Sequence, residues 1–192
     1  NGLRGMFHIG TMKYMELMPV MPVKLINYSE GEHGDLLQEV AYCARVSNPG
    51  NQASKETSEK LLKYLIKHKH WSPFEMVSIC LEIKTTRDIA RQILRHRSFS
   101  FQEFSQRYAD VNWLKMGIPI PELRSQDDKN RQNSIDDIPE EQQKRLKNQI
   151  SRHFYEAMDL YNELIREGIA KECARFVLPR ASPSRICMTG SV

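Results

Sequence analysis

The stretch MVSICLEIKTTRDIARQILRHRSFSFQEFSQRY, residues 76–108, decides the fold class of this chain. From Met76 to Lys84 apolar and polar residues alternate, which is the period of a β-strand with one buried face, and its apolar positions are Val77, Ile79, Leu81 and Ile83. Thr86 can then cap a helix over residues 87–97. A strand that runs directly into an amphipathic helix indicates a mixed α+β architecture.

The end of this stretch, residues 95–108, is too polar for a core and too aromatic for an ordinary solvated loop. Arg87, Arg91 and Arg95 lie four residues apart, so they share one face of the expected helix, and a solvated surface is the simplest interpretation of them. Guanidinium groups also bind phosphates in bidentate fashion. Because the chain has neither a GxxxxGK[ST] loop nor a GxGxxG turn, arginines must hold any nucleotide that it binds.

Apolar periodicity predicts the other elements. A strand is expected at 22–29, and helices are expected at 35–47 with Asp35 as cap, at 58–68, from Pro139 to Gly168, and at 170–178 before Pro179. Residues 109–138 form a polar excursion with two prolines and a third directly after it at Pro139, and no closing element is expected after the turn-like TGS near Val192. Together these elements predict an antiparallel sheet flanked by helices.

Length and composition limit the functional classes. With 192 residues, 40% of them hydrophobic, we expect an N-terminal extension at 1–21 and a single domain at 22–192, incomplete at its C-terminal end. The net charge of +4 is lower than that of a nonspecific nucleic-acid binder, so we expect no nucleic-acid partner. Neither a secretory signal nor a run of about eighteen apolar residues is present. We therefore expect a cytoplasmic protein without membrane contact.

Four cysteines and a histidine pair raise the question of metal or thiol chemistry. The cysteines are far apart without a CxxC pair, so we expect small core residues in a reducing compartment, with Cys187 as the candidate for exposure. None stands next to an activating histidine. His68 and His70 lack a third ligand at a recognised spacing, and a surface or cofactor contact is favoured over a metal site. We expect no metal.

Four segments carry a resemblance to a known family. Arg95, His96 and Arg97 followed by seven residues and Ser105 reproduce the RHR-x7-S signature of the flavin-dependent thymidylate synthases, and the segments CARVS (43–47), HWSPFE (70–75) and ECARFVLP (172–179) match in order. The resemblance implies a homotetrameric enzyme with active sites shared between subunits. It would convert dUMP to dTMP with methylenetetrahydrofolate as one-carbon donor, FAD as cofactor and NADPH as reductant.

The resemblance also implies roles for individual residues. Matching positions assign cofactor contacts to Ser47, His70, Ser72, Glu75, Arg95, His96, Arg97 and Glu103. Other matching positions assign dUMP contacts to Gln92, Arg95, Glu103, Ser105, Arg107 and Arg175. Among these, Arg107 and Ser105 are the expected catalytic residues.

The chemistry of these side chains suits those roles. Arg175 and Arg95 can each stabilise a nucleotide phosphate by about 1.5–3 kcal/mol through charge-assisted hydrogen bonds. Arg107 can stabilise the negative charge that develops at a uracil carbonyl. Ser105 does not stand in a GxSxG motif, the turn that exposes a nucleophilic serine, so a hydrogen bond to dUMP is favoured over a nucleophilic role. The flavin supplies hydride transfer, and no protein nucleophile is required.

The chain departs from the family pattern at Met76, where a histidine is usual, at Arg180, where a leucine is usual, and at Cys187, where an aromatic residue is usual. The arginine and the helix that normally follow the TGS-like turn are absent from the sequence. Two alternatives therefore stay open. One is a degenerate, inactive structural homologue, and the other is a basic-helix nucleic-acid module that binds phosphates with steep salt dependence.

Overall fold

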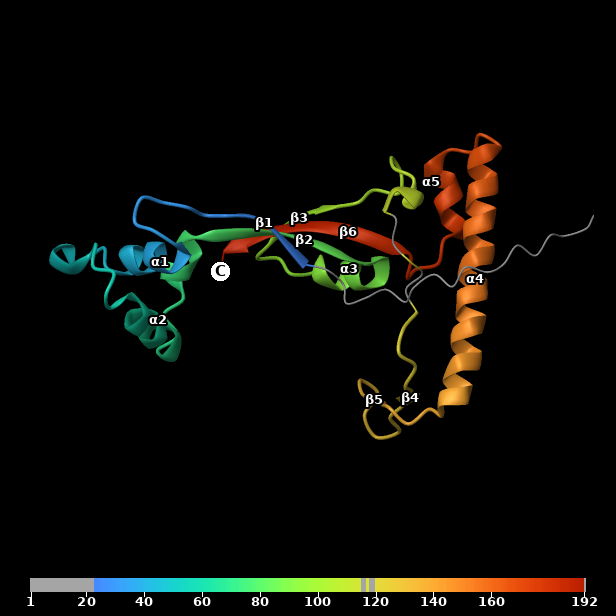
Figure 1. Ribbon diagram of the computed structural model, residues 1–192, viewed down its shortest axis with the longest axis horizontal. Coiled ribbons are helices and arrows are strands. Elements are labelled where there is room, and N and C mark those ends of the chain that lie inside the picture. The colour runs from blue at the N-terminus through green and yellow to red at the C-terminus, as the bar shows by residue number, and fades with distance from the viewer. Residues whose placement is uncertain (1–22, 115–116, 118–119, 192) are drawn as a thin grey trace, which may run out of the picture.

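An antiparallel four-stranded sheet forms the middle of the molecule, with helices at both of its ends (Figure 1). The computed structural model describes residues 23–114, 117 and 120–191. Every neighbouring pair of strands is antiparallel in the order β1-β2-β6-β3, and the strands are β1 (Val23–Tyr28), β2 (Ser78–Thr86), β3 (Ser100–Glu103) and β6 (Pro183–Ser191). The α+β prediction is confirmed.

The helices gather in two groups on either side of the strands (Figure 1). At one end lie α1 (Leu36–Ala44), α2 (Ser58–Lys67) and the 3-10 turns η1 (Pro49–Asn51) and η2 (Ser72–Met76). At the other end lie η3 (Val111–Leu114), α4 (Glu140–Arg166), α5 (Lys171–Ala174) and η4 (Arg175–Val177). Helix α3 (Arg87–Ile93) lies along the sheet, and β4 (Ser125–Gln126) pairs with β5 (Ser134–Ile135) in a separate hairpin.

Local sequence signals account for the ends of the best-defined helices. The Asp35 carboxylate accepts a 3.0 Å hydrogen bond from the backbone amide of Gln38 and so caps α1, as expected. Helix α4 begins after Pro139 and carries two glutamates in its first turn, where the helix dipole favours negative charge. It is followed by Gly168 at φ +80°, a conformation that favours glycine and ends the helix.

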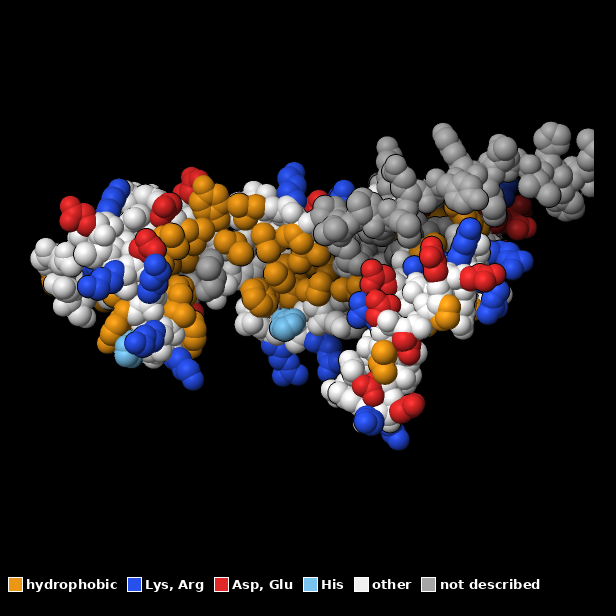
Figure 2. Space-filling view, turned by 60° about the horizontal axis from the view of Figure 1, so that its bottom comes forward, with side chains coloured by type: hydrophobic (Ala, Val, Ile, Leu, Met, Phe, Trp, Pro, Cys, Tyr) orange, Lys and Arg blue, Asp and Glu red, His pale blue; other side chains and the backbone are white. Residues whose placement is uncertain are grey.

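Two small cores hold the helical groups, whereas the sheet between them is thinly covered. The first core consists of Val40, Ala41, Leu62 and Val77, and the second consists of Val111, Tyr161 and Ala174. All six residues of the edge strand β1 are exposed. Figure 2 shows hydrophobic side chains gathered in the open over the middle of the molecule, where the sheet lies.

The structure corrects several expectations about the strands. Strand β6 is central in the sheet, although no strand was predicted over 183–191 and TGS was interpreted as a turn, and β3 was not predicted either. In β2 the positions from Ile79 to Lys84 are all partly exposed, so the predicted single buried face is wrong. Both faces of β2 are shielded only in part because few elements pack on this sheet.

Corrections also apply to α3 and to the cysteines. Helix α3 ends at Ile93 rather than at Arg97. Thr86 occupies the cap position, but its hydroxyl bonds to the Asp88 carboxylate instead of a backbone amide. The expectation of core cysteines is wrong for Cys173, which is exposed, while the other three are partly buried, including Cys187.

The expected N-terminal extension and the expected polar excursion can be compared with the structure only in part. The extension at 1–21 lies outside the described residues. Within the expected excursion at 109–138, the structure describes η3 and the β4–β5 hairpin, so that segment has some local structure. Among the described helices, none is both long and apolar enough to cross a membrane.

Tyr161 provides a test of the second core. Its side chain is fully buried and its hydroxyl makes no hydrogen bond of normal geometry. Burial raises the pKa of Tyr161, and the Asp110 carboxylate adds to this rise in pKa, while the Val111 amide opposes it. Because an unpaired buried hydroxyl costs about 1–3 kcal/mol, Tyr161→Phe is expected to keep or increase the free energy of unfolding. Tyr161→Ala, which leaves a cavity, should reduce it by about 3–5 kcal/mol.

Urea unfolding followed by circular dichroism measures both changes. A loss of more than about 1 kcal/mol in Tyr161→Phe would show that the hydroxyl has a stabilising partner and would contradict this description of the core.

Candidate functional site

A pocket lined by arginines opens where the start of α3 meets the chain that leads into β6. Its volume is about 370 Å³, and its lining residues are Arg87, Arg91, Gln106, Arg175, Phe176, Leu178, Pro179 and Arg180. We call it the arginine pocket. Four guanidinium groups and no carboxylate line it, so its charge suits an anion.

The fold brings these arginines together from distant parts of the sequence. Arg87 and Arg91 lie one helical turn apart on α3, and the Arg87 amide donates a 2.8 Å hydrogen bond to the carbonyl of Ser182. This bond ties the start of α3 to the segment that precedes β6. Arg175 begins η4, and its Nε donates a 3.2 Å hydrogen bond to the carbonyl of Glu172.

Gln106 is the one buried side chain among the residues that line the arginine pocket. It is only 4% exposed, and its Nε2 has no hydrogen-bond partner. A buried amide without a partner costs about 1–3 kcal/mol, a penalty that a bound anion would remove. Sequence reasoning predicted Arg175 here but missed Arg87, Arg91, Gln106 and Arg180 as one group, since only the tertiary structure brings them together.

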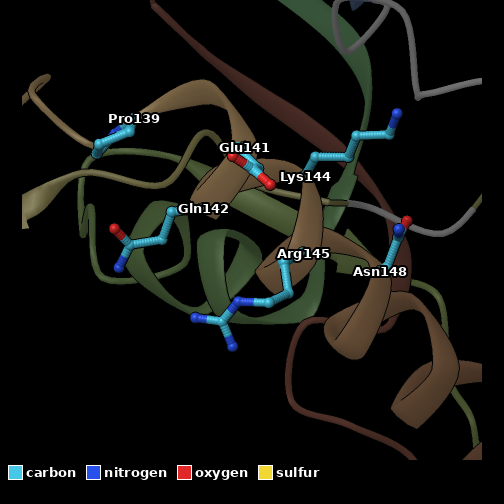
Figure 3. A pocket seen from close by; sticks show the side chains of 6 residues that line it. All are labelled: Pro139, Glu141, Gln142, Lys144, Arg145 and Asn148. Carbon is cyan, nitrogen blue, oxygen red and sulfur yellow. The ribbon is translucent and has the colours of Figure 1, made fainter.

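A second, larger hollow of about 810 Å³ lies on the first turns of α4. All six of its lining residues come from segment 139–148, and Figure 3 shows their side chains pointing in different directions instead of toward a common centre. It contains both signs of charge. No sequence motif falls on it, and we assign it no chemistry.

The RHR motif forms an exposed turn between α3 and β3. Arg95, His96 and Arg97 are all exposed, and neither guanidinium forms an ion pair with a described residue. The Phe99 amide donates a 3.4 Å hydrogen bond to the His96 carbonyl, and the two rings meet edge to face with centroids 6.4 Å apart. The guanidinium groups of Arg95 and Arg97 could bind the two phosphates of a dinucleotide cofactor, because neither is occupied by an ion pair and the Phe99 contacts support the turn.

The other predicted cofactor residues lie near the same end of the sheet. Ser72 and Glu75 are exposed on η2, directly before β2, and His70 is exposed just ahead of it, with its ring centroid 6.3 Å from that of Tyr64. Ser78, the first residue of β2, pairs with Ser191, while Ser100, which follows the RHR turn, pairs with Thr189. The strand register therefore places η2 and the RHR turn at one end of the sheet.

Ser47 lies on an exposed loop that a buried arginine holds in place. Arg45 is 6% exposed, and its guanidinium donates to the Ser54 carbonyl, to the Thr57 hydroxyl at 2.9 Å and to the Ser58 hydroxyl at 3.5 Å. Sequence analysis did not identify this anchor. The bonds fix the loop that carries Ser47 against the start of α2.

The expected catalytic residues follow β3. The Ser105 Oγ accepts a 3.4 Å hydrogen bond from the Arg107 amide, and the Arg107 guanidinium donates to the Tyr108 hydroxyl at 2.8 Å. Arg107 is exposed and is not among the residues that line the arginine pocket. The Glu103 carboxylate accepts a 3.0 Å hydrogen bond from Ser184, and Gln92 is exposed on α3.

Within one chain, η2 and the arginine pocket lie at opposite ends of β2. This strand has nine residues from Ser78 to Thr86, so its ends are roughly 26 Å apart at about 3.3 Å per residue. The RHR turn is closer to the pocket, because Arg95 follows Arg91 by one helical turn and its amide bonds to the Gln92 carbonyl at 3.2 Å. One chain therefore does not bring the predicted residues of η2 to the arginine pocket.

The three departures from the family pattern occupy different environments. Met76 is 60% exposed, and Cys187 is partly buried in β6 opposite Glu82. Arg180 lines the arginine pocket, so this substitution adds a positive charge there. Among the described residues, no group of three or more histidine, cysteine or acidic side chains is arranged to hold a metal ion.

Comparison with known proteins places the chain in a family. The family model described as thymidylate synthase complementing protein (Thy1) matches residues 24–192. The chain is 53% identical over 154 residues to the probable flavin-dependent thymidylate synthase of Paramecium bursaria Chlorella virus 1, covering 80% of this chain and 69% of that protein. It is 50% identical over 153 residues to the flavin-dependent thymidylate synthase of Synechocystis sp., covering 80% of this chain and 68% of that protein.

Solved structures give the same result. The crystal structure of the UMP/dUMP methylase PolB from Streptomyces cacaoi, bound with 5-Br dUMP, superposes with a TM-score of 0.73 and 27% sequence identity, covering 92% of this chain and 75% of that one. The chain therefore belongs to the thymidylate synthase complementing protein family, a family of methyl-transferring enzymes whose members include the flavin-dependent thymidylate synthases.

Proposed function

We propose that this protein forms dTMP from dUMP in the cytoplasm, with methylenetetrahydrofolate as one-carbon donor, FAD as cofactor and NADPH as reductant. The observation that carries the proposal is the arginine pocket, in which the unpaired Gln106 amide stands among four guanidinium groups. The match to flavin-dependent thymidylate synthases supports the reaction.

In this proposal the arginine pocket binds the phosphate of dUMP. A nucleotide phosphate is close to a dianion, and each charge-assisted hydrogen bond to it contributes about 1.5–3 kcal/mol. Arg175 and Arg180 approach from the segment before β6, while Arg87 and Arg91 approach from α3. Gln106 Nε2 would donate an additional hydrogen bond and so lose its desolvation penalty.

The RHR turn is proposed to hold FAD. FAD bound there and reduced by NADPH would supply the hydride, which no amino-acid side chain can provide. Arg95 and Arg97 would bind its diphosphate, His96 would orient it, and Ser47, His70, Ser72, Glu75 and Glu103 would complete the contacts. The free guanidiniums of the turn are consistent with this assignment.

Arg107 and Ser105 are proposed to act on the uracil ring, with contacts from Gln92 and Glu103. The methylene acceptor carbon becomes nucleophilic when a cation stabilises negative charge at the neighbouring carbonyl, and Arg107 is suited to this task. Its guanidinium lies 5.2 Å from the centre of the Tyr108 ring and is hydrogen-bonded to that residue's hydroxyl, so its position is partly fixed before substrate binds.

The active enzyme is proposed to be a homotetramer with shared sites. Ser72 and Glu75 on η2 lie at the opposite end of β2 from the arginine pocket, and this separation of roughly 26 Å is too long for a flavin ring held at η2 to react with dUMP in the pocket of the same chain. A second copy can place its η2 beside the arginine pocket of the first. Val23, Leu25 and Ile26 on the edge strand β1 are 45–59% exposed, which provides apolar surface for such contacts.

The arginine pocket makes a direct prediction about dUMP affinity. Gln106→Glu keeps the size of the side chain but adds a negative charge that repels phosphate, and Arg91→Ala removes one guanidinium. Each is expected to raise the Kd for dUMP at least about tenfold, as measured by isothermal titration calorimetry. Gln142→Glu, on the exposed start of α4, is the matched control and should leave the Kd unchanged. Unchanged affinity in both pocket variants would remove the phosphate assignment.

Arg107 makes a prediction about the chemical step. The protein should form dTMP only when dUMP, methylenetetrahydrofolate, NADPH and FAD are all present. Arg107→Ala should lower kcat by about 10²–10³-fold, the usual effect of removing one oxyanion donor, with the oligomer intact by light scattering. Arg124→Ala, which removes an exposed arginine paired with Glu122, is the control.

Normal turnover in Arg107→Ala would contradict its role. A wild-type protein that binds the ligands without turnover would be a degenerate homologue.

Shared sites predict complementation between inactive variants. Arg95→Ala and Arg175→Ala should each be inactive alone, whereas a co-refolded equal mixture should regain roughly a quarter of wild-type activity if subunits assemble at random. Mixing Arg91→Ala with Arg175→Ala should restore nothing, because both residues line the pocket of one chain. If the first mixture stays inactive while mixed oligomers form, the sites are not shared in this way.

A further inference from the structure

Gly190 on the central strand has an aromatic ring where a side chain would otherwise be. A Cβ atom built on Gly190 would lie 2.3 Å from Cδ1 of Phe99, 2.8 Å from Cε1 and 3.3 Å from Cγ. Ser100 pairs with Thr189, so extending the register by one residue places Phe99 opposite Gly190. The ring therefore lies directly over the glycine backbone, a position that any other residue at 190 would block.

The backbone at Gly190 is fixed by its other neighbour. Gly190 pairs with Ile79 of β2, within the longest continuous ladder of the sheet, which runs from Ser78–Ser191 to Thr86–Pro183. Because this ladder resists displacement, a Cβ at position 190 has to push the Phe99 ring away.

Phe99 is in turn connected to the RHR turn by two contacts. Its amide donates to the His96 carbonyl at 3.4 Å, and its ring meets the His96 ring edge to face at 75°. The Phe99 ring is also near the ring of Phe101 in β3, with centroids 6.4 Å apart and planes tilted by 55°. A displaced Phe99 ring would consequently remove the support of His96 and of the arginines on either side of it.

We propose that Gly190 is a positioning residue for the cofactor: by admitting the Phe99 ring onto the central strand, it sets the conformation of the Arg95–Arg97 turn that binds the FAD diphosphate. This inference rests on the proposed role of the RHR turn. Gly190 does not touch the cofactor in this proposal, and it acts only through Phe99 and His96.

Gly190→Ala tests the proposal in the purified protein. Hydrogen exchange followed by mass spectrometry should show faster exchange in the peptide that contains residues 94–101 and unchanged exchange in α2. The Kd for FAD, measured by flavin fluorescence, should rise at least tenfold while the Tm stays close to that of the wild type. Gly50→Ala is the matched control, because a Cβ there meets no atom within 4 Å, and both readouts should stay unchanged.

A second substitution separates positioning from general damage to the fold. In the Phe99→Leu background the shorter side chain leaves room for a Cβ, so adding Gly190→Ala should change the Kd for FAD less than twofold. A tenfold loss in both backgrounds would overturn the proposal, as would unchanged exchange at 94–101 in the single variant. Faster exchange with unchanged FAD affinity would also overturn it.

If the wild-type protein bound no FAD, the proposed function would fail together with this inference. FAD binding that is insensitive to Gly190→Ala would remove the inference alone.

Discussion

The two-sided pairing of β6 is the constraint on which the rest of the structure depends. This strand pairs with β2 along its whole length and with β3 on its other edge, so it joins segments far apart in the sequence. The helical groups at the two ends have separate small cores and are linked mainly through this ladder. Because the sheet has little cover, its backbone hydrogen bonds set the distance between η2 and the arginine pocket more than side-chain packing does.

This arrangement explains why the functional unit in our proposal is larger than one chain. A central ladder roughly 26 Å long is rigid, so the groups at its ends cannot approach each other by bending of the sheet. Association of copies brings opposite ends together and also covers apolar side chains such as Leu25 that the single chain leaves exposed. The same surface thus accounts for both the thin core and the divided site.

The sequence predicted the elements whose stability is local. Helix α4 was predicted from Pro139 to Gly168 because its apolar period and its end signals are all contained in one segment. Strand β6 was missed because PSRICMTGS has no alternating apolar pattern, and it becomes a strand through pairing with β2 and β3. Helix α3 was predicted too long, since the propensity of its last residues continues past Ile93 while the tertiary contacts of Phe99 require a turn there.

The site shows the same division between local and long-range information. The RHR motif was visible in the sequence as consecutive residues, but Arg87, Arg91 and Arg180 had no meaning as a group until the hydrogen bond from Arg87 to Ser182 joined their segments. With α3 ending before Arg95, the arginines do not form one continuous stripe along a helix, as the basic-helix alternative requires. They surround a concave pocket with a buried amide, and that geometry is suited to one small anion rather than to an extended phosphate backbone.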